Sequence, residues 1–346
     1  MSNVAALPAF LALSRLDQRD AYLVASEELD RPPEVLEKDV WVCWTLDALF
    51  RCPDMPAMAF RGGTSLSKIF NAISRFSEDI DVTMDHNGLA PDLDPYEPKS
   101  RRQRDRDDET LRGLMCERST DVLAPHLRGL MAEAGLSEDM LLTEKGGEML
   151  TVRYPHLVEG RNEYYLEGVK IEFGGRNMIE PNQTHTVVPY MATPFSNFAF
   201  PGGEVSVLSP MRTFWEKVTL AHAESNRPDF KNAERTSRHW HDLAVLAEHE
   251  IGRVALLDVE LLGDVVRVKE RFFRSRTSQY DRCLTGEANL LPGDAGLSLL
   301  RADYQKMLDA ELLDAPLPFD ELVERVRALQ DEINAVTNCL TRPTAS

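Results

Sequence analysis

The chain has 346 residues, of which 43% are hydrophobic, so it can bury a sizeable core and is longer than one average domain requires. Its 39 basic and 57 acidic residues give a formal net charge of -18, which argues against sequence-independent coating of DNA or RNA, so any contact with nucleic acid must be local. The 5 scattered cysteines indicate neither a disulfide framework nor a zinc site, and no stretch approaches the roughly 18 apolar residues of a membrane span. We therefore expect an untargeted protein of the reducing cytoplasm.

Two helices are expected near the N-terminus, at residues 17–30 and 34–50. The second is apolar nearly all round, which predicts a helix buried on several sides, so we assign Trp41 and Trp44 to the core rather than to a surface that stacks on a ligand. The charged residues 37–39 precede this apolar run. We expect them on a solvated turn; the alternative is that they point into a site.

The stretch FRGGTSLSKIFNAISRFSEDIDVTMD, residues 60–85, reads as a glycine turn, a short helix and a strand. Gly62 and Gly63 give a backbone that phosphate can approach. Thr64 and Ser65 can cap the helix, whose first amides point at an anion. The stretch therefore predicts a phosphate-binding turn.

Alternation replaces helical spacing at the end of this stretch, so that Asp79, Asp81 and Thr83 fall on one face of a strand. Two carboxylates two residues apart converge on a space the size of a metal ion, and Mg²⁺ is normally held by one or two carboxylates together with substrate phosphates. A Walker A loop needs a lysine and a hydroxyl after its second glycine, which Gly63 and its successors do not offer, so a P-loop is disfavoured.

The next part of the chain reverses the sign of charge. Residues 86–98 have the composition of a loop, and residues 99–106 then carry five basic side chains against one aspartate. A solvated helix start explains this run, and contact with a phosphate backbone is the functional alternative. Apolar residues at helical spacing predict an amphipathic helix at 108–134.

Five strands are expected between residues 139 and 208, in the segments MLLTEK, MLTVRYP, YYLEGVKIEFG, HTVVPYM and EVSVLS. In the third of these, Lys170 and Glu172 share the face opposite the apolar residues. Because carboxylates are depleted in strands unless they are exposed or used, Glu172 lies either on an exposed edge or beside Asp79 and Asp81 as a third acidic ligand.

The remainder is predicted to be helical, beginning with Pro210 in the first turn of a helix. A lone lysine on that helix, Lys217, is usually solvent-facing. On the next helix Arg238 and Asp242 lie one turn apart, as in an ordinary surface ion pair. His239 and His241 lack a metal-binding pattern such as HExxH and are interpreted as non-ligands.

Residues 267–276 interleave basic side chains with aromatic ones. Such a pattern can contact nucleic acid, and amphipathic packing explains the aromatics equally well. Together with 99–106, this segment is a candidate local grip on RNA.

The paired aspartates and the glycine turn meet the needs of metal-assisted phosphoryl or nucleotidyl transfer, to which a lysine aimed at the phosphates would add charge stabilisation. A DxD pair alone is weak, because sugar-nucleotide transferases and phosphatases also use it. The preceding turn and helix narrow the choice.

At this point several motifs, in this order, resemble one family: RGGTSLSK, RFSEDIDV, KIEF, WEKVTLAHAE and RHWHDLAVL. The chain is similar in them to the AbiEii/AbiGii-type nucleotidyltransferase toxins, whose fold is related to that of DNA polymerase beta. The similarity spans most of the chain, and the GG-to-RFSEDID motif is its most specific part. One departure is that the family's last motif commonly begins Arg-Asp, whereas here His239 follows Arg238, so any role of that acid is absent or altered.

The resemblance implies roles for individual residues. Asp79 and Asp81 become magnesium ligands, with Glu172 a less secure third, and Lys217 and Asp242 join the active site. The nucleotide-binding candidates within the quoted motifs are Gly62, Gly63, Thr64, Ser65, Lys68, Ser77 and Arg238.

The resemblance also implies an α+β fold: a nucleotidyltransferase-like mixed sheet with flanking helices at 1–208, carrying a helical insertion at about 99–136, and a C-terminal helical domain at 209–346 that completes the active-site cleft. The implied function is that of the toxin of a type IV toxin–antitoxin system, of the kind associated with phage defence. It would use Mg²⁺, or Mn²⁺ in its place, to move a nucleoside monophosphate from a triphosphate to an acceptor, the 3′ end of tRNA, and a cognate antitoxin would neutralise it.

Two alternatives stay open at this stage. One is a small-molecule nucleotidyltransferase of the antibiotic-modifying type, which would label a metabolite and leave RNA untouched. The other is a non-catalytic nucleotide-sensing module, against which the intact pair Asp79 and Asp81 weighs.

Overall fold

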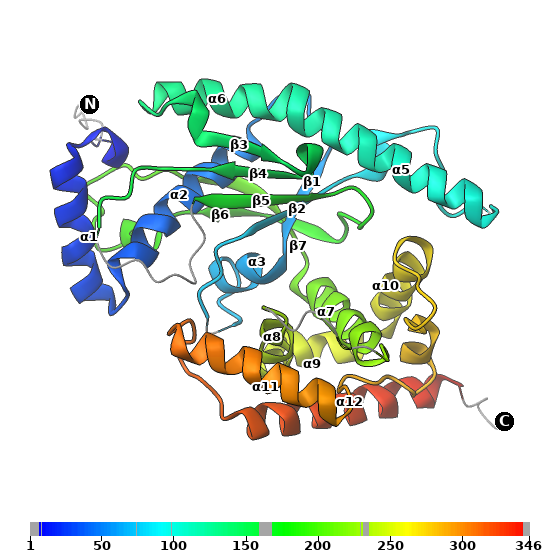
Figure 1. Ribbon diagram of the computed structural model, residues 1–346. Helices are drawn as coiled ribbons and strands as arrows, with labels where there is room; N and C mark the ends of the chain where they lie inside the picture. Colours follow the sequence, from blue (N-terminus) through cyan, green and yellow to red (C-terminus); the bar gives the residue numbers. More distant parts are fainter. Residues whose placement is uncertain are drawn as a thin grey trace, which may run out of the picture. The chain divides into compact units, whose positions relative to one another are not determined.

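The computed structural model describes Leu7 and residues 9–73, 75–97, 99–158, 168–228, 230 and 235–341. The chain forms two compact units (Figure 1). Unit 1 comprises Met1–Thr64, Ser77–Asp94 and Lys99–Val207, and unit 2 comprises Ser65–Phe76, Pro95–Pro98 and Leu208–Ser346. Two short segments from the first half of the sequence thus group with the C-terminal part.

Unit 1 contains both helices and short strands. They are α1 (Arg15–Leu29), α2 (Pro33–Phe50), β1 (Met58–Arg61), β2 (Ile80–Met84), α4 (His86–Leu89), α5 (Arg101–Glu117), α6 (Ala124–Glu133), β3 (Leu141–Glu144), β4 (Met149–Val152), β5 (Val169–Gly174), β6 (Asn182–Val187) and β7 (Gly203–Leu208, whose last residue belongs to unit 2). The helix α3 (Gly62–Lys68) contributes its first three residues to unit 1 and the rest to unit 2.

The seven strands form one sheet in the order β3-β4-β5-β2-β1-β7-β6. Its centre is mixed, because β2 pairs antiparallel with β1 and parallel with β5, while β1 pairs parallel with β7. Helices α2, α5 and α6 pack against the sheet (Figure 1). The predicted α+β class with a mixed sheet is confirmed.

Helix α2 carries the core of unit 1. Trp41 and Trp44 are buried, and the ring of Trp41 stacks on Tyr154 with centroids 5.4 Å apart, so their assignment to the core is confirmed. A second cluster joins α2 to the N-terminal segment through Phe10, whose ring stacks on that of Phe200 at 4.7 Å. A helix so enclosed has little surface left for solvent.

The charged turn of α2 contradicts the sequence-based expectation. Glu37, Lys38 and Asp39 are 1%, 3% and 3% exposed, so the prediction of a solvated turn is wrong. Three consecutive helical positions point in directions spread over about 200°. All three can be buried only because α2 is surrounded on most of its circumference, which the local sequence does not reveal.

Two further differences concern segment boundaries. The predicted loop at 86–98 contains the short helix α4, for which the side chain of Asp85 accepts a hydrogen bond from the backbone N–H of Asn87 at 3.2 Å. Strand β6 begins earlier than expected, at Asn182, and part of the strand predicted at 164–174 lies outside the described residues.

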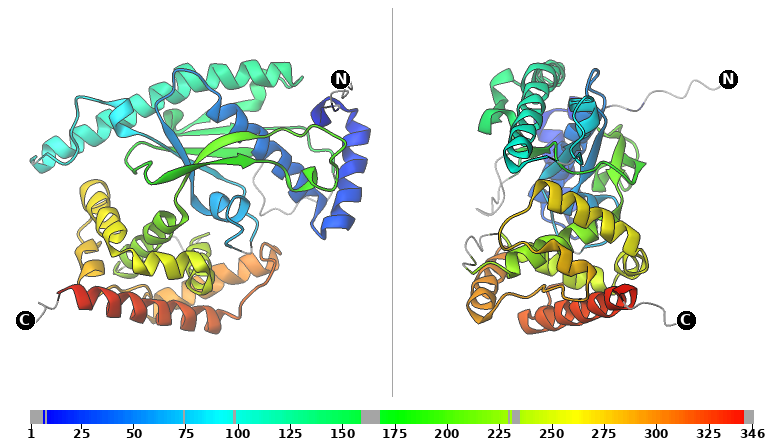
Figure 2. Two further views of the ribbon diagram at one scale, coloured as in Figure 1. Left: turned by 180° about the vertical axis from the view of Figure 1, so that it is seen from behind. Right: turned by 90° about the vertical axis from the view of Figure 1, so that its right-hand side faces the viewer.

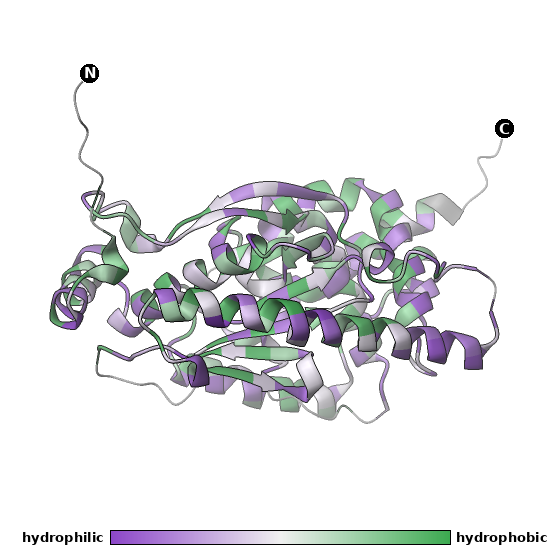
Figure 3. Ribbon diagram, turned by 90° about the horizontal axis from the view of Figure 1, so that it is seen from above, coloured by the Kyte–Doolittle hydropathy of each residue, from purple (hydrophilic) through white to green (hydrophobic). Residues whose placement is uncertain are grey.

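Helices α5 and α6 follow one another through the π-helical turn Arg118–Leu123 and correspond to the predicted helix at 108–134. Ser100 and Gln103 form a reciprocal capping box at the start of α5. The first turns of α5 are hydrophilic and exposed, whereas apolar residues recur later in the helix (Figure 3).

Unit 2 is built mainly from helices (Figure 2). They are α7 (Pro210–Ser225), α8 (Ser237–Glu248), α9 (Glu250–Leu257), α10 (Val259–Phe272), α11 (Asp294–Asp309) and α12 (Phe319–Thr341). Trp215 and Trp240 are each 1% exposed in their core, and the indole N–H of Trp240 donates to the carbonyl of Leu290 at 2.7 Å. Within the described ranges, no helix combines the length and apolarity that a membrane span requires.

Candidate functional site

The predicted order of turn, helix and strand is present at the centre of the sheet. Strand β1 ends at Arg61 and α3 begins at Gly62, which has a φ of 84°, in the left-handed region that favours glycine. A Cβ at Gly62 would lie 2.1 Å from Oδ2 of Asp81, far inside contact distance. Glycine therefore lets the chain turn here while the Asp81 carboxylate lies against its backbone.

Thr64 fastens this turn to the segment that leads into β2. Its hydroxyl donates to the carbonyl of Asp79 and shares a hydrogen bond of 2.9 Å with the hydroxyl of Ser77. Thr64 is the third residue of α3 and its side chain points to these partners, so the expectation that it caps the helix is wrong. Ser77 thus contacts the glycine turn through the side chain of Thr64. The binding of nucleotide by these two residues stays a prediction.

Asp81 lies on β2 in register with Arg61 of β1 and with Glu172 of β5. Residues in register on neighbouring strands direct their side chains to the same face, so Glu172 faces the same side of the sheet as Asp81. Glu172 is partly exposed and forms an ion pair with Lys170 of the same strand. Its role as a third metal ligand stays a prediction.

Asp79 immediately precedes β2 and is 8% exposed, while Asp81 is partly buried. Carboxylate oxygens two residues apart on extended backbone are hard donors of the kind that Mg²⁺ takes, and the pair fits an ion that completes its coordination with water and substrate phosphates. Among the residues that the structure describes, no group of three His, Cys, Asp or Glu side chains has the arrangement of a complete metal site.

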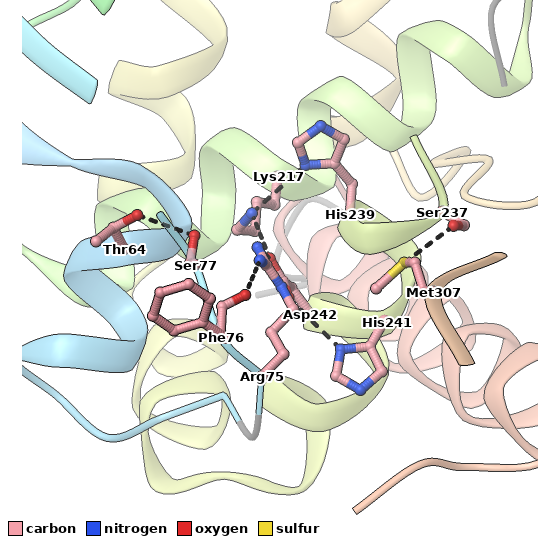
Figure 4. A network of polar contacts seen from close by, with 10 residues as sticks. All are labelled: Thr64, Arg75, Phe76, Ser77, Lys217, Ser237, His239, His241, Asp242 and Met307. Atoms are coloured by element: carbon pink, nitrogen blue, oxygen red, sulfur yellow. Dashed lines mark hydrogen bonds and ion pairs between the residues drawn. The ribbon is translucent and has the colours of Figure 1, made fainter. Parts of the chain in front are cut away.

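A second charged cluster lies within unit 2 (Figure 4). Asp242 of α8 is 0% exposed and accepts a bidentate pair of hydrogen bonds from Arg75, with Nε to Oδ1 at 2.7 Å and Nη2 to Oδ2 at 2.9 Å. Nζ of Lys217, on α7, lies 2.8 Å from Oδ2 of the same carboxylate. Two cations thus share one anion, and the three side chains carry a formal charge of +1.

Burial and charge set the protonation of this cluster. Burial alone would raise the pKa of Asp242, but Arg75 and Lys217 outweigh it and hold that pKa well below its ordinary value of 3.8. Burial lowers the pKa of Lys217 from 10.5, and Asp242 opposes only part of that shift. The carboxylate is therefore ionised throughout the neutral range.

Two histidines flank the carboxylate. Nδ1 of His239 lies 3.5 Å from Nζ of Lys217, and Nδ1 of His241 lies 3.6 Å from Oδ1 of Asp242. Burial, together with the positive charges of Lys217 and Arg238, holds the pKa of His239 well below 6.5. His239 is therefore a neutral neighbour of the lysine at neutral pH.

The start of α8 is anchored by Asp303 of α11. Its carboxylate accepts hydrogen bonds from the backbone N–H groups of Arg235 and Ser237 at 2.7 and 2.8 Å, and from the hydroxyl of Ser237 at 2.6 Å. The Ser237 hydroxyl also contacts the sulfur of Met307 (Figure 4). These bonds satisfy orphan amides and fix the start of the helix that carries Asp242.

Two interpretations of unit 2 are corrected by this geometry. Lys217 is 7% exposed and is not solvent-facing, and Asp242 is not half of a surface pair with Arg238, because it is fully buried and bound to Arg75 and Lys217. Sequence reasoning missed Arg75. The signal was available, because Arg75 opens the RFSEDID motif, but nothing local indicates a partner 167 residues away.

The other nucleotide-binding candidates stay predictions. Gly63 and Ser65 lie in the first two turns of α3, and Lys68 is its last residue. Ser65 is buried and Lys68 is partly buried, while Arg238 is partly exposed on α8.

The segment 99–106 is largely exposed. Lys99 pairs with Asp107 at 3.0 Å, whereas Arg101 and Arg102 lie on the exposed surface of the first turn of α5. The side chains of these two arginines are therefore exposed on unit 1, where an anionic partner can contact them.

The segment 267–276 makes more contacts within its own unit. Arg267 pairs with Asp264 at 2.5 Å and its guanidinium lies 4.2 Å from the ring centre of Tyr96. Lys269 is 8% exposed, and Arg271 donates to the carbonyl of Pro95. Packing therefore accounts for much of this basic and aromatic pattern.

Comparisons with known proteins bear on this chemistry. A family model described as "Nucleotidyl transferase AbiEii toxin, Type IV TA system" matches residues 44–325. The search of curated proteins finds no match. Among solved structures the chain is similar to MenT4, a nucleotidyltransferase toxin from Mycobacterium tuberculosis, with 19% identity over 94% of this chain and 99% of that chain and a TM-score of 0.41.

Proposed function

This chain belongs to the AbiEii family of nucleotidyltransferase toxins from type IV toxin–antitoxin systems, and from that premise we propose that it transfers a nucleoside monophosphate to the 3′ end of a tRNA in a Mg²⁺-dependent reaction. The resemblance seen in the sequence motifs is thereby confirmed at the level of the family. The family implies a nucleoside triphosphate as substrate and an antitoxin as partner. The metal, the acceptor and the residues that serve them are the content of the proposal.

The observation that carries the proposal is the close approach of Asp81 to the backbone of Gly62. This contact puts a carboxylate beside the turn that the sequence predicts to bind phosphate. Asp79 and Asp81 would hold the divalent ion, and Glu172 is the candidate for a further ligand. When bound, such an ion supplies neutralisation of triphosphate charge and activation of the attacking hydroxyl.

The cluster in unit 2 supports binding of the phosphates. Lys217 and Arg75 both bind the carboxylate of Asp242, and the formal charge of +1 on these three side chains would favour an approaching phosphate. Lys217 would donate to phosphate oxygens as charge develops on them. Asp242 would orient both cations, and His239, held neutral, would accept from Lys217 without competing for the anion.

Binding of the acceptor must overcome the net charge of -18. Arg101 and Arg102 are exposed at the start of α5 and are our first candidates for contact with the RNA backbone. The segment 267–276 is the second candidate, and the side chain of Arg274 within it is 66% exposed.

The direct test incubates the purified protein with each of the four triphosphates, labelled on the α-phosphate, together with deacylated tRNA, total RNA or a small-metabolite extract. We expect label in tRNA that requires added Mg²⁺ or Mn²⁺ and is abolished by chelation. Asp81→Asn, which removes one charge at nearly constant volume, should lose the transfer while keeping the thermal unfolding temperature within a few degrees.

Other outcomes separate the alternatives. Label in a metabolite with RNA untouched would favour a small-molecule nucleotidyltransferase. No label in any acceptor, together with Asp81→Asn as harmless to growing cells as the wild type, would overturn the proposal. Metal-dependent binding of triphosphate without its consumption would then favour a nucleotide sensor.

A further inference from the structure

The buried turn of α2 reaches three separate parts of unit 1. Glu37 accepts a hydrogen bond from the backbone N–H of Leu157 at 2.7 Å, and Asp39 accepts one from that of Tyr190 at 2.6 Å. Lys38, between them, forms a buried ion pair with Glu78. Of these three contacts only the last one involves the segment that carries the predicted metal ligands.

Glu78 directly precedes Asp79. Both lie in the segment that leads into β2, so a contact that fixes the side chain of Glu78 also restricts the backbone that carries Asp79. The same segment is also held through its backbone, because Thr64 donates to the carbonyl of Asp79. Asp79 thus lies between two fixed points, one on the side chain before it and one on its own carbonyl.

Stability alone gives no reason for a lysine and a glutamate here. Moving two charges out of water is costly, and apolar residues of similar volume are often as stabilising as a buried ion pair or more so. A charged hydrogen bond differs from apolar packing in its direction, because it fixes where Glu78 points. Lys38 also neutralises the acid next to Asp79, which keeps like-charge repulsion within the run Glu78, Asp79 and Asp81 low.

We propose that Lys38 and Glu78 are positioning residues that hold Asp79 in the geometry required for binding the divalent ion. This inference rests on the proposed function, since it assigns Asp79 to the metal. Partners that orient metal-binding carboxylates typically change metal affinity or activity by about 10-fold to 100-fold when they are removed. Lys38 and Glu78 do not themselves touch the substrate.

The test compares Lys38→Met with Asp39→Asn. Both variants remove a buried charge from the same turn, but the hydrogen bond of Asp39 goes to the backbone N–H of Tyr190, whereas Lys38 pairs with Glu78. Binding of Mn²⁺ alone is followed by electron paramagnetic resonance, the metal dependence of the transfer reaction gives a second readout, and thermal unfolding is recorded for every variant.

We expect Lys38→Met to weaken Mn²⁺ binding and to raise the metal concentration for half-maximal transfer by about 10-fold or more. Asp39→Asn should leave both values within about twofold of the wild type even where it lowers the unfolding temperature comparably. Lys38→Arg, which keeps the charge, should restore part of the affinity. Equal shifts in Lys38→Met and Asp39→Asn, or wild-type metal dependence in Lys38→Met, would overturn the inference.

A variant that fails to fold does not end the test. The double variant Lys38→Met with Glu78→Leu is expected to fold, because it removes together the two charges that form the buried ion pair. It should still require more metal; wild-type metal dependence in this variant contradicts the inference. If the wild type itself shows neither Mn²⁺ binding nor transfer, the proposed function fails instead.

Discussion

Unit 1 gathers carboxylates along β2, whereas unit 2 gathers two cations around one carboxylate. The carboxylates of unit 1 are those of Asp79 and Asp81. The cations of unit 2 are Arg75 and Lys217, which bind Asp242. Acidic oxygens favour a divalent cation, whereas clustered cations favour an anion such as phosphate. The pair of Lys38 and Glu78 is different from both, because its two formal charges cancel.

The net charge of a buried cluster indicates its use better than burial alone. A balanced pair such as Lys38 and Glu78 can serve geometry. A cluster with an excess of one charge favours the binding of a ligand of the opposite sign, because burying an unpaired charge costs free energy.

The largest expected effect comes from removing the anion of the cationic cluster. Asp242→Ala leaves Arg75 and Lys217 buried without their shared carboxylate, so we expect a loss of about 3–5 kcal/mol in the free energy of unfolding. Chemical denaturation measures it. Glu248→Ala, at an exposed position of the same helix, should change stability by no more than about 0.5 kcal/mol. A loss for Asp242→Ala as small as this would show that the two buried cations do not depend on Asp242 for their stability.

Removing one cation should separate stability from activity. Lys217→Met leaves Arg75 and Asp242 as a balanced pair, so the unfolding free energy should stay within about 1 kcal/mol of the wild type. The transfer rate should fall by about 10²-fold to 10³-fold, as for other groups that stabilise charge in the transition state. Lys306→Met, an exposed lysine on α11, is the matched control. Full activity in Lys217→Met would contradict the proposal that Lys217 binds the phosphates.

The acidic side of the comparison is tested at the glycine turn. Gly62→Ala places a methyl group against the Asp81 carboxylate in a left-handed backbone conformation, with an expected cost of about 1–3 kcal/mol and loss of transfer. Gly129→Ala lies on α6, where an added Cβ meets nothing within 4 Å, and should be neutral or stabilising. Unfolding free energies and transfer rates of the two variants decide the point.

The smallest effect is a pH dependence. The folded protein holds the pKa of His239 well below 6.5, so the unfolded chain binds a proton that the folded chain does not, and stability falls as pH drops below about 6.5. One such group contributes up to about 1.4 kcal/mol per pH unit. A further loss is expected below pH 3.8, where Asp242 protonates only in the unfolded chain.

His239→Gln isolates the first of these two effects. The charged neighbours Lys217, Arg238, Arg75 and Asp242 stay in place, so the variant should lose part of the slope between pH 6.5 and pH 5 while keeping the loss in the acid range. An unchanged slope would show that other groups, among them the buried His222, account for it.

Much of the fold follows from local patterns. The apolar circumference of α2, the proline at the start of α7 and the alternation in β2 predict those elements because each depends on residues close in sequence. The glycine turn and the paired aspartates were found for the same reason. What the sequence could not give is which distant residues meet.

Arg75 shows this limit most clearly. Its partner Asp242 is 167 residues away, and neither residue differs in type from dozens of exposed arginines and aspartates. The same holds for Glu37, Lys38 and Asp39, where base frequencies favour a solvated turn and only long-range contacts explain burial. The family resemblance predicted Lys217 and Asp242 as site residues. It did not predict Arg75, the second cation that binds Asp242.

The turn at the start of α2 also constrains how the protein can be made. Its three partners lie 40, 120 and 151 residues further along the chain, at Glu78, Leu157 and Tyr190. At a synthesis rate of about 5–20 residues per second, these charges wait roughly 8–30 s for the last partner to be translated. A chain that has not been translated beyond Tyr190 therefore cannot make all three contacts, so unit 1 is completed only after more than half of the polypeptide has been synthesised.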